Sequence, residues 1–284
     1  MKPQRFYSIS PVILTICLVL TITACCERFQ GPAKPLSITA IDQKNVVGYL
    51  LPKDLPNSIT LIPPFPSKDS AANAVDEEVS RKSLVLRGTS RWMLAAEDAD
   101  LTFPRAARVF SCALNAPITE EDTPHLYRLL RRSLSDASLS TYPAKNYYNR
   151  PRPFLINREA TCTPDSESHL AKSGSYPSGH TAVGWAWALI LSEIVPEQSE
   201  ALLARGRAFG QSRVICNVHW HSDVMEGLVM GAAVVGRLHA DPAFRADLEA
   251  AKAEVAAIRK KGLKPLRDCK AEEAALGLRL PGIP

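Results

Sequence analysis

One segment constrains the fold of this chain more than any other, namely Gly179–Ile194 with the sequence GHTAVGWAWALILSEI. Its apolar residues cover nearly the whole circumference of a helix rather than one stripe, which is typical of a buried helix. The segment is too short to cross a membrane, because a membrane span takes about 20 apolar residues. It ends before Pro196 and follows a polar stretch. We therefore expect a central helix that other helices surround.

The rest of the chain predicts an all-α fold, a single compact helical bundle over residues 67–284. A helix starting at Thr123 and Pro124 carries a stripe of four leucines at helical spacing. The sequence has no strand alternation of useful length and no internal repeat. Further helices are predicted over residues 67–82, 89–100, 104–114, 197–209, 218–238 and 241–260.

Two stretches rich in proline are predicted to be non-helical. Residues 25–66 show little periodicity, and Leu61–Pro66 cannot lie inside a helix because proline lacks the N–H and clashes with the preceding turn. We expect an extended arm that lies on the domain. Residues 140–178 hold five prolines and many polar residues, and a loop of that length in a compact domain is usually functional.

Residues 1–24 are typical of an export signal. Lys2 and Arg5 precede an apolar run at Val12–Leu20, and small residues follow it. Two cleavage alternatives stay open. Ile22–Cys25 resembles the lipobox of bacterial lipoproteins, in which Cys25 is lipidated and tethers the protein to a membrane. The alternative is ordinary cleavage near Ala24. Either way, we expect a periplasmic protein.

The composition excludes several classes of protein. Of the 284 residues, 46% are hydrophobic and 22% are charged, which excludes a disordered chain. The formal net charge of +5 falls to +3 when Lys2 and Arg5 leave with the signal. This weak charge, with no basic run between aromatic residues, argues against nucleic-acid binding. Small acidic substrates remain compatible with it.

Four cysteines in the body of the chain predict two disulfides in an oxidising compartment. Three connectivities are open. We predict Cys162–Cys269, which joins the long loop to the C-terminal tail, and Cys112–Cys216, whose members lie on or beside helices. None of the cysteines has the Cys-x-x-Cys spacing of a zinc knuckle or a thioredoxin-like site.

Three short motifs carry the chemistry. They are Lys145-x6-Arg152-Pro153, Gly174–His180 (GSYPSGH) and Ser212-Arg213-x5-His219-x3-Asp223. The first and third motifs supply fixed cations, and guanidinium groups grip oxyanions through paired N–H donors. Ser178 and Gly179 open the apolar helix, where free backbone N–H groups and the helix dipole favour an anion. Together these groups describe a phosphate site.

The histidines add a reactive group to this site. His219 and Asp223 are four residues apart, so on a helix they share one face. A carboxylate there can bind one ring nitrogen, fix the tautomer and leave the other nitrogen as a nucleophile. His180 is a second histidine that can serve as an acid.

Each motif alone has an ordinary structural explanation, but the three in this order and spacing make a chance match very improbable. His219 and His221 form a His-x-His pair that could indicate a metal, yet no third ligand is near in sequence. His221 lies on another helix face, so we leave it out of the site. Tyr147, Tyr148 and Trp220 either line the mouth of the site or pack in the core, and both readings stay open.

The motif order resembles the signature of the phosphatidic-acid phosphatase type 2 and vanadium haloperoxidase superfamily. Within it, the chain is similar to the bacterial class A non-specific acid phosphatases over about residues 60–260. The export signal, the Pro-rich arm and Gly88–Trp92 also fit that group. One departure is Phe65, which interrupts a proline run that is often unbroken in the family.

The resemblance implies a role for each motif residue. His219 would attack phosphorus and form a phosphohistidine, and Asp223 would orient it. His180 would protonate the leaving alcohol and then activate water. The groups that would hold the phosphate oxygens are Lys145, Arg152, Ser178, Gly179 and Arg213. We expect no metal or other cofactor, because three cations supply the charge stabilisation that phosphoryl transfer needs.

The function implied is an acid phosphatase that hydrolyses a broad range of organic phosphomonoesters and releases inorganic phosphate. Two enzymatic alternatives from the same superfamily are a lipid phosphate phosphatase, which would have several membrane spans, and a vanadate-dependent peroxidase, which would be longer. A non-enzymatic alternative is a phosphate-binding lipoprotein, which would not need both histidines and Asp223. The natural substrate, the pH optimum and the oligomeric state, including a homo-oligomer, stay open.

Overall fold

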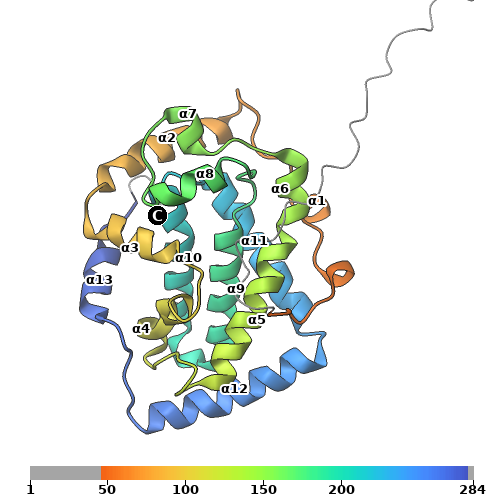
Figure 1. Cartoon of the computed structure of the whole chain (residues 1–284), viewed down its shortest axis with the longest axis vertical. Coiled ribbons are helices and arrows are strands. Elements are labelled where there is room, and N and C mark those ends of the chain that lie inside the picture. Colours follow the sequence, from red (N-terminus) through yellow and green to blue (C-terminus); the bar gives the residue numbers. More distant parts are fainter. Residues whose placement is uncertain (1–45, 281–284) are drawn as a thin grey trace, which may run out of the picture. The chain divides into compact units, whose positions relative to one another are not determined.

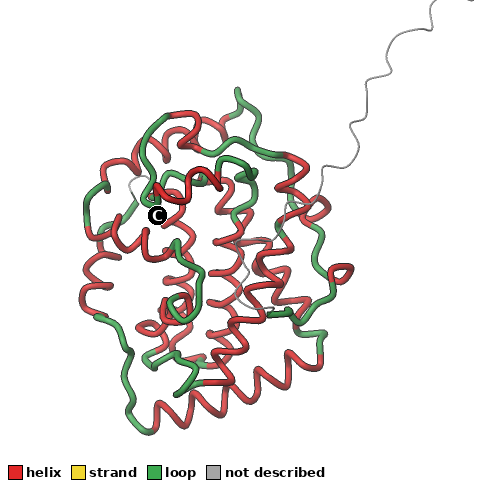
Figure 2. The backbone as a smooth tube through the Cα atoms, viewed as in Figure 1, coloured by secondary structure: helices red, strands yellow, loops and turns green. Residues whose placement is uncertain are grey.

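A computed structural model describes residues 46–280 of the chain, all of which belong to one compact unit, residues 38–284. Within the described range every regular element is a helix, and no strand occurs (Figures 1 and 2). The predicted all-α fold is therefore confirmed. The predicted signal, its cleavage site with Cys25, and the first part of the arm lie outside the described residues.

Helix α9 (Gly179–Ile194) is the centre of the domain (Figure 1). It packs against α5 (Pro124–Ser140), α10 (Ser199–Ile215) and α11 (His221–Leu238). Trp187 is completely buried, and its ring N–H donates to the backbone oxygen of Leu130 at 3.0 Å. The expected buried central helix is confirmed, because its apolar circumference needs partners on all sides.

The remaining helices cover this centre. α12 runs across one end of the bundle and packs on α5 (Figure 1). Their bounds are α1 (Ser58–Leu61), α2 (Ala71–Ser83), α3 (Ser90–Asp98), α4 (Ser111–Leu114), α6 (Tyr142–Tyr148), α7 (Pro153–Asn157), α8 (Glu167–Leu170), α12 (Pro242–Lys260) and α13 (Cys269–Gly277). Short 3-10 turns lie at Pro52–Asp54, Leu84–Leu86, Ala106–Phe110, Pro164–Ser166 and Pro196–Gln198. Within the described range no helix is long and apolar enough to span a membrane.

The stretch 140–178 is not the continuous loop that the sequence predicted, because it contains α6, α7 and α8. Three of its five prolines begin helical turns instead of interrupting them. Pro143, Pro153 and Pro164 each occupy one of the first two positions of their turn, where the missing N–H costs no hydrogen bond. The segment is therefore a series of short helices, and Lys145 lies on one of them.

Both predicted cysteine pairs are wrong. The structure pairs Cys112 with Cys269 and Cys162 with Cys216, with Cα atoms 5.5 Å and 4.7 Å apart. The prediction failed because it treated the region after residue 260 as a tail. That region contains α13, which packs on α3 and begins at Cys269, beside α4 and its Cys112.

The part of the arm that the structure describes begins at residue 46 and includes the short helix α1. Asp136 on α5 accepts the backbone N–H groups of Tyr49 and Leu50 at 2.8 and 3.0 Å. Further along, the Tyr176 hydroxyl donates to the Pro63 oxygen at 2.6 Å. Phe65, the residue that interrupts the proline run, packs its ring against Tyr176 with centroids 6.0 Å apart. The arm thus reaches the segment that contains the second motif.

Candidate active site

Lys145 lies on α6 with its side chain almost completely buried. Its Nζ donates to the backbone oxygens of Gly174 and Ser175 at 3.1 and 3.3 Å. Burial, with the neighbouring Arg152, holds the pKa of Lys145 well below its ordinary value. Gly174 has no room for a side chain, because a Cβ there would lie 2.5 Å from the Lys145 oxygen. The second motif therefore lies directly against α6.

Arg152 immediately precedes α7 and is 3% exposed. Its guanidinium donates to the backbone oxygens of Leu170, Ser173 and Val218 at 2.9, 3.2 and 3.0 Å. Its Nη1 also lies 3.1 Å from Nε2 of His219. Burial lowers the pKa of Arg152 to about 10. These contacts fix the guanidinium beside the imidazole, still charged at any physiological pH.

Ser178 caps the N-terminus of α9, where its Oγ accepts the Thr181 N–H at 3.2 Å. Its own N–H donates to the backbone oxygen of Asp223 at 2.9 Å, which joins this turn to α11. Gly227 on α11 lets the two helices approach, because a Cβ there would lie 2.7 Å from the Ser178 oxygen. Gly179 follows the cap, and a Cβ built on it lies 3.7 Å from Cε of Lys145. The start of α9 therefore faces the Lys145 side chain.

His180 is the second residue of α9 and is partly buried. Its Nε2 lies 2.9 Å from the backbone oxygen of Ala99, just after α3. A carbonyl only accepts, so Nε2 carries a proton and Nδ1 is the nitrogen that can gain or lose one. Burial and the charge of Arg213 hold the pKa of His180 well below its ordinary value. Both effects favour the neutral form of the ring, and the charge of a bound anion would oppose them.

Arg213 lies near the end of α10 and is 2% exposed. Its Nε and Nη1 have no hydrogen-bond partner within the described residues. Burial, followed by the charge of Arg152, lowers its pKa to about 9. A buried donor without an acceptor costs free energy, so this group is suited to an oxyanion that enters the site.

His219 and Asp223 do not share a helix face as predicted, because α11 begins only at His221. Instead Asp223 occupies the first turn and accepts the Trp220 N–H at 2.9 Å, while His219 precedes the helix. Asp223 Oδ2 lies 3.2 Å from His219 Nδ1. Because Arg152 can only donate, Nε2 of His219 is the acceptor and Nδ1–H faces the carboxylate. The pairing was right, although a helix terminus rather than a helix face produces it.

Charges converge on this pair from several elements. The cations near His219 are Arg152, Lys145 and Arg213, and together with burial they hold its pKa well below its ordinary value. Burial raises the pKa of Asp223. The structure thus brings together all eight residues predicted for the site, which are Lys145, Arg152, Ser178, Gly179, His180, Arg213, His219 and Asp223.

Sequence reasoning missed two buried residues of this cluster, Arg150 and Asp76. Arg150 donates to Asp223 at 2.7 Å and to Asp76 at 2.8 Å. One signal was present, since Arg150-Pro151 repeats the Arg-Pro pair of the first motif. Nothing marked Asp76, which lies on α2 in a polar segment with many charges.

The other candidates have structural roles or remain at the surface. Trp220 donates its ring N–H to the Pro151 oxygen at 2.8 Å and is buried, whereas Tyr147 is 70% exposed. His221 begins α11 and is partly buried. Among residues 46–280, no three His, Cys, Asp or Glu side chains gather as a metal site would require.

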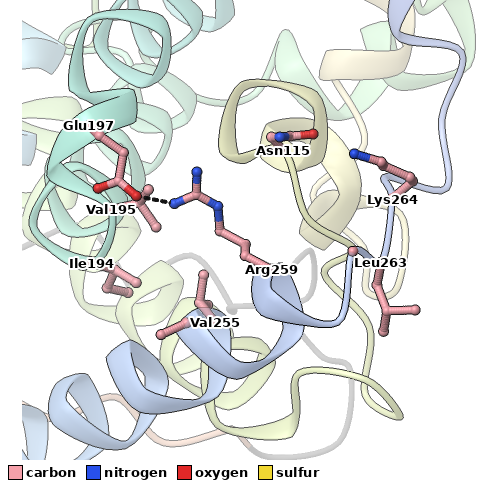
Figure 3. A pocket seen from close by; sticks show the side chains of 10 residues that line it. Asn115, Ile194, Val195, Glu197, Val255, Arg259, Leu263 and Lys264 are labelled. Atoms are coloured by element: carbon pink, nitrogen blue, oxygen red, sulfur yellow. Dashed lines mark hydrogen bonds and ion pairs between the residues drawn. The ribbon is translucent and has the colours of Figure 1, made fainter.

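Two surface pockets lie away from these residues. One, of about 520 Å³, is lined by α12 and by the chain after α9, and Figure 3 shows the ion pair between Arg259 and Glu197 inside it. The other, of about 560 Å³, lies between α10 and α13 beside the Cys112–Cys269 disulfide. No residue of the three motifs lines either pocket.

Comparison with known proteins agrees with the geometry. The PAP2 superfamily pattern matches residues 132–246. A non-specific acid phosphatase of Providencia stuartii is 44% identical over 213 residues, which cover 75% of this chain and 86% of that protein. One of Salmonella typhimurium is 43% identical over 72% of this chain and 82% of its own. An acid phosphatase of Zymomonas mobilis is 39% identical over 76% of this chain and 81% of its own. The chain therefore belongs to the PAP2 superfamily and, within it, to the family of the non-specific acid phosphatases.

Proposed function

We propose that this acid phosphatase hydrolyses phosphomonoesters through a phosphohistidine formed on His219. The observation that carries the proposal is the fixed tautomer of His219. Its Nδ1–H faces Asp223, so Nε2 has the lone pair. That lone pair lies beside Arg152, a cation suited to bind a phosphate oxygen.

In the first step, Nε2 of His219 attacks phosphorus and the bond between phosphorus and the alcohol oxygen breaks. His180 gives its Nδ1 proton to the departing oxygen. The negative charge of the substrate favours the protonated form of His180, because it opposes the nearby cations that lower the pKa of this histidine. Asp223 stabilises the positive charge that develops on the His219 ring.

In the second step, His180 takes a proton from water, the oxygen attacks phosphorus, and the N–P bond breaks to release inorganic phosphate. Through both steps the phosphate oxygens are held by Lys145, Arg152, Arg213, the Ser178 hydroxyl and the Gly179 N–H. Because the residues of the cluster recognise only the phosphate, we propose a broad range of alcohol groups. Two disulfides support an oxidising compartment, and hence a periplasmic enzyme.

Rapid quench with a labelled phosphomonoester tests this mechanism. We expect label on His219 that acid removes and base does not, and His219→Ala should lose both the label and turnover. His180→Ala should slow poor leaving groups by roughly 10²- to 10⁴-fold and spare nitrophenyl phosphate in part. The exposed His169 supplies the control His169→Ala, which should change nothing. Label on His180, or turnover that survives in His219→Ala, would contradict the proposal.

A further inference from the structure

Arg150 joins two buried carboxylates behind the catalytic pair. It lies between α6 and α7 and is 4% exposed. Its Nη1 donates to Oδ1 of Asp223 at 2.7 Å, and its Nη2 donates to Oδ2 of Asp76 at 2.8 Å. The other oxygen of Asp223 faces His219. A line of hydrogen bonds therefore runs from α2 through Arg150 to the imidazole.

Asp76 is held as firmly as Arg150. It is 1% exposed, and its Oδ1 accepts the Ser222 N–H at 2.7 Å. Its Oδ2 accepts the Ser222 hydroxyl at 2.6 Å, and that hydroxyl also accepts from Arg150 at 2.8 Å. Ser222 immediately precedes Asp223, so the carboxylate of α2 fixes the same turn of chain that carries the catalytic carboxylate.

Aromatic rings complete the environment of the guanidinium. Its Cζ lies 5.0 Å from the centroid of Phe65 and 5.3 Å from that of Trp220. These contacts and its three polar partners leave Arg150 no freedom to move toward a substrate. It therefore acts on the reaction only through Asp223.

We propose that Arg150 and Asp76 are positioning residues of the proposed phosphohistidine mechanism, on which this inference rests. Arg150 holds Asp223 ionised and aligned with His219. Asp76 balances the charge of Arg150, so that the three groups together keep one net negative charge for the imidazole. Without Asp76, Arg150 would neutralise much of the field that Asp223 exerts on His219.

The test is the pH profile of kcat/KM, whose acid limb reports protonation of the nucleophile. Asp76→Asn removes a negative charge, so the limb should move to lower pH by about one unit. Arg150→Met removes a positive charge and should move it to higher pH. Both should lower kcat by about 10- to 100-fold with little change in KM, because neither residue contacts the substrate. The titratable and charged groups that face this network, unchanged in both variants, are Lys145, Arg152, His180, Arg213 and His221.

Two further variants separate positioning from stability. Asp136 is a buried carboxylate away from the site that accepts two backbone N–H groups, so Asp136→Asn is the control for loss of a buried carboxylate. It should lower stability and leave the pH profile unchanged. Arg150→Lys keeps the positive charge, so the acid limb of kcat/KM should return to its wild-type pH. Its kcat should stay low, because one ammonium cannot bridge both carboxylates. It also keeps the test available if Arg150→Met does not fold.

The inference would be overturned if the acid limb of the kcat/KM profile moved in the same direction in Asp76→Asn and Arg150→Met. It would also be overturned if the limb did not move in either variant. The labelling experiment keeps this failure distinct from failure of the mechanism. Label on His219 without opposite shifts refutes only the positioning role, whereas absence of label on His219 refutes the mechanism itself.

Discussion

The three buried cations of the site differ in what holds them. Lys145 donates to two backbone oxygens, and Arg152 donates to several. Arg213 leaves Nε and Nη1 without a partner among the described residues. Burial of Arg213 therefore lowers the free energy of unfolding, because these N–H groups lose their water and gain no acceptor. A bound phosphate would supply the acceptors. Function and stability oppose each other at this one residue.

Arg213→Met should raise the stability of the free protein while lowering activity. Methionine fills a similar volume without a buried charge, and we expect about 1 kcal/mol, or about 2–4 °C in Tm. The value of kcat/KM should fall by about 10²- to 10³-fold. Thermal unfolding and steady-state kinetics measure both. Arg207→Met, on the exposed side of the same helix, is the control. A variant that loses stability along with activity would contradict this account.

The sequence could predict the reactive residues but not the residues behind them. Motif spacing selected His219 and Asp223, since their residue types and order are unusual together. Asp76 lies in a polar segment in which acidic side chains usually face solvent, and its burial depends on a contact with Ser222, 146 residues later. The tautomer of His219 depends likewise on Arg152, which only the folded chain places beside it.

At the level of elements, the site depends on how closely α11 approaches the start of α9. Gly227 makes this approach possible, because a Cβ would lie 2.7 Å from both the Ser178 oxygen and Cβ of Thr181. Both neighbours are fixed, one by the backbone and the other by the cap of α9. Gly236, further along α11, has open space around it.

Gly227→Ala and Gly236→Ala should therefore have opposite effects. The first should cost about 1–3 kcal/mol and lower kcat/KM, because the Ser178 turn at the start of α9 must shift. The second should be neutral or stabilising by about 0.5–1 kcal/mol, since alanine favours the helix. Urea unfolding and kinetics on both variants check this. Equal effects of the two substitutions would show that the helix approach does not control the site.

Long apolar helices were the easiest elements to predict, and short ones the hardest. The bounds of α9 and α12 follow from apolar spacing and flanking prolines. α6, α7 and α8 are only four to seven residues long and have no amphipathic pattern to detect. Contacts with the rest of the domain stabilise them, and local sequence does not encode those contacts.

For the whole molecule, the buried histidines make stability depend on pH. Burial and nearby cations lower the pKa of His180 and of His219 in the folded chain. Below pH of about 6.5 the unfolded chain binds protons that the folded chain does not, so stability falls as pH falls through that window. Asp136, whose pKa burial raises to about 6, acts in the opposite direction.

The double variant His180→Asn/His219→Asn should lose less stability on acidification than the wild type. Two fewer protons are bound on unfolding, so the slopes should differ by up to about 2.7 kcal/mol per pH unit well below pH 6.5. Urea unfolding between about pH 5 and pH 8 measures them, and Asp136 titrates in both proteins. Parallel curves would mean that folding does not lower the pKa of these histidines.

The disulfide pattern also sets the order in which partner cysteines become available in an oxidising compartment. Cys162 and Cys216 both precede Cys269 in the chain, so in a chain that emerges N-terminus first their bond, across 54 residues, can close first. Cys112 must wait as a free thiol until its partner, 157 residues later, has been made. During that interval Cys162 and Cys216 are both available to it as wrong partners. Closure of the Cys162–Cys216 bond before Cys269 emerges would remove both wrong partners and so favour the native pairing.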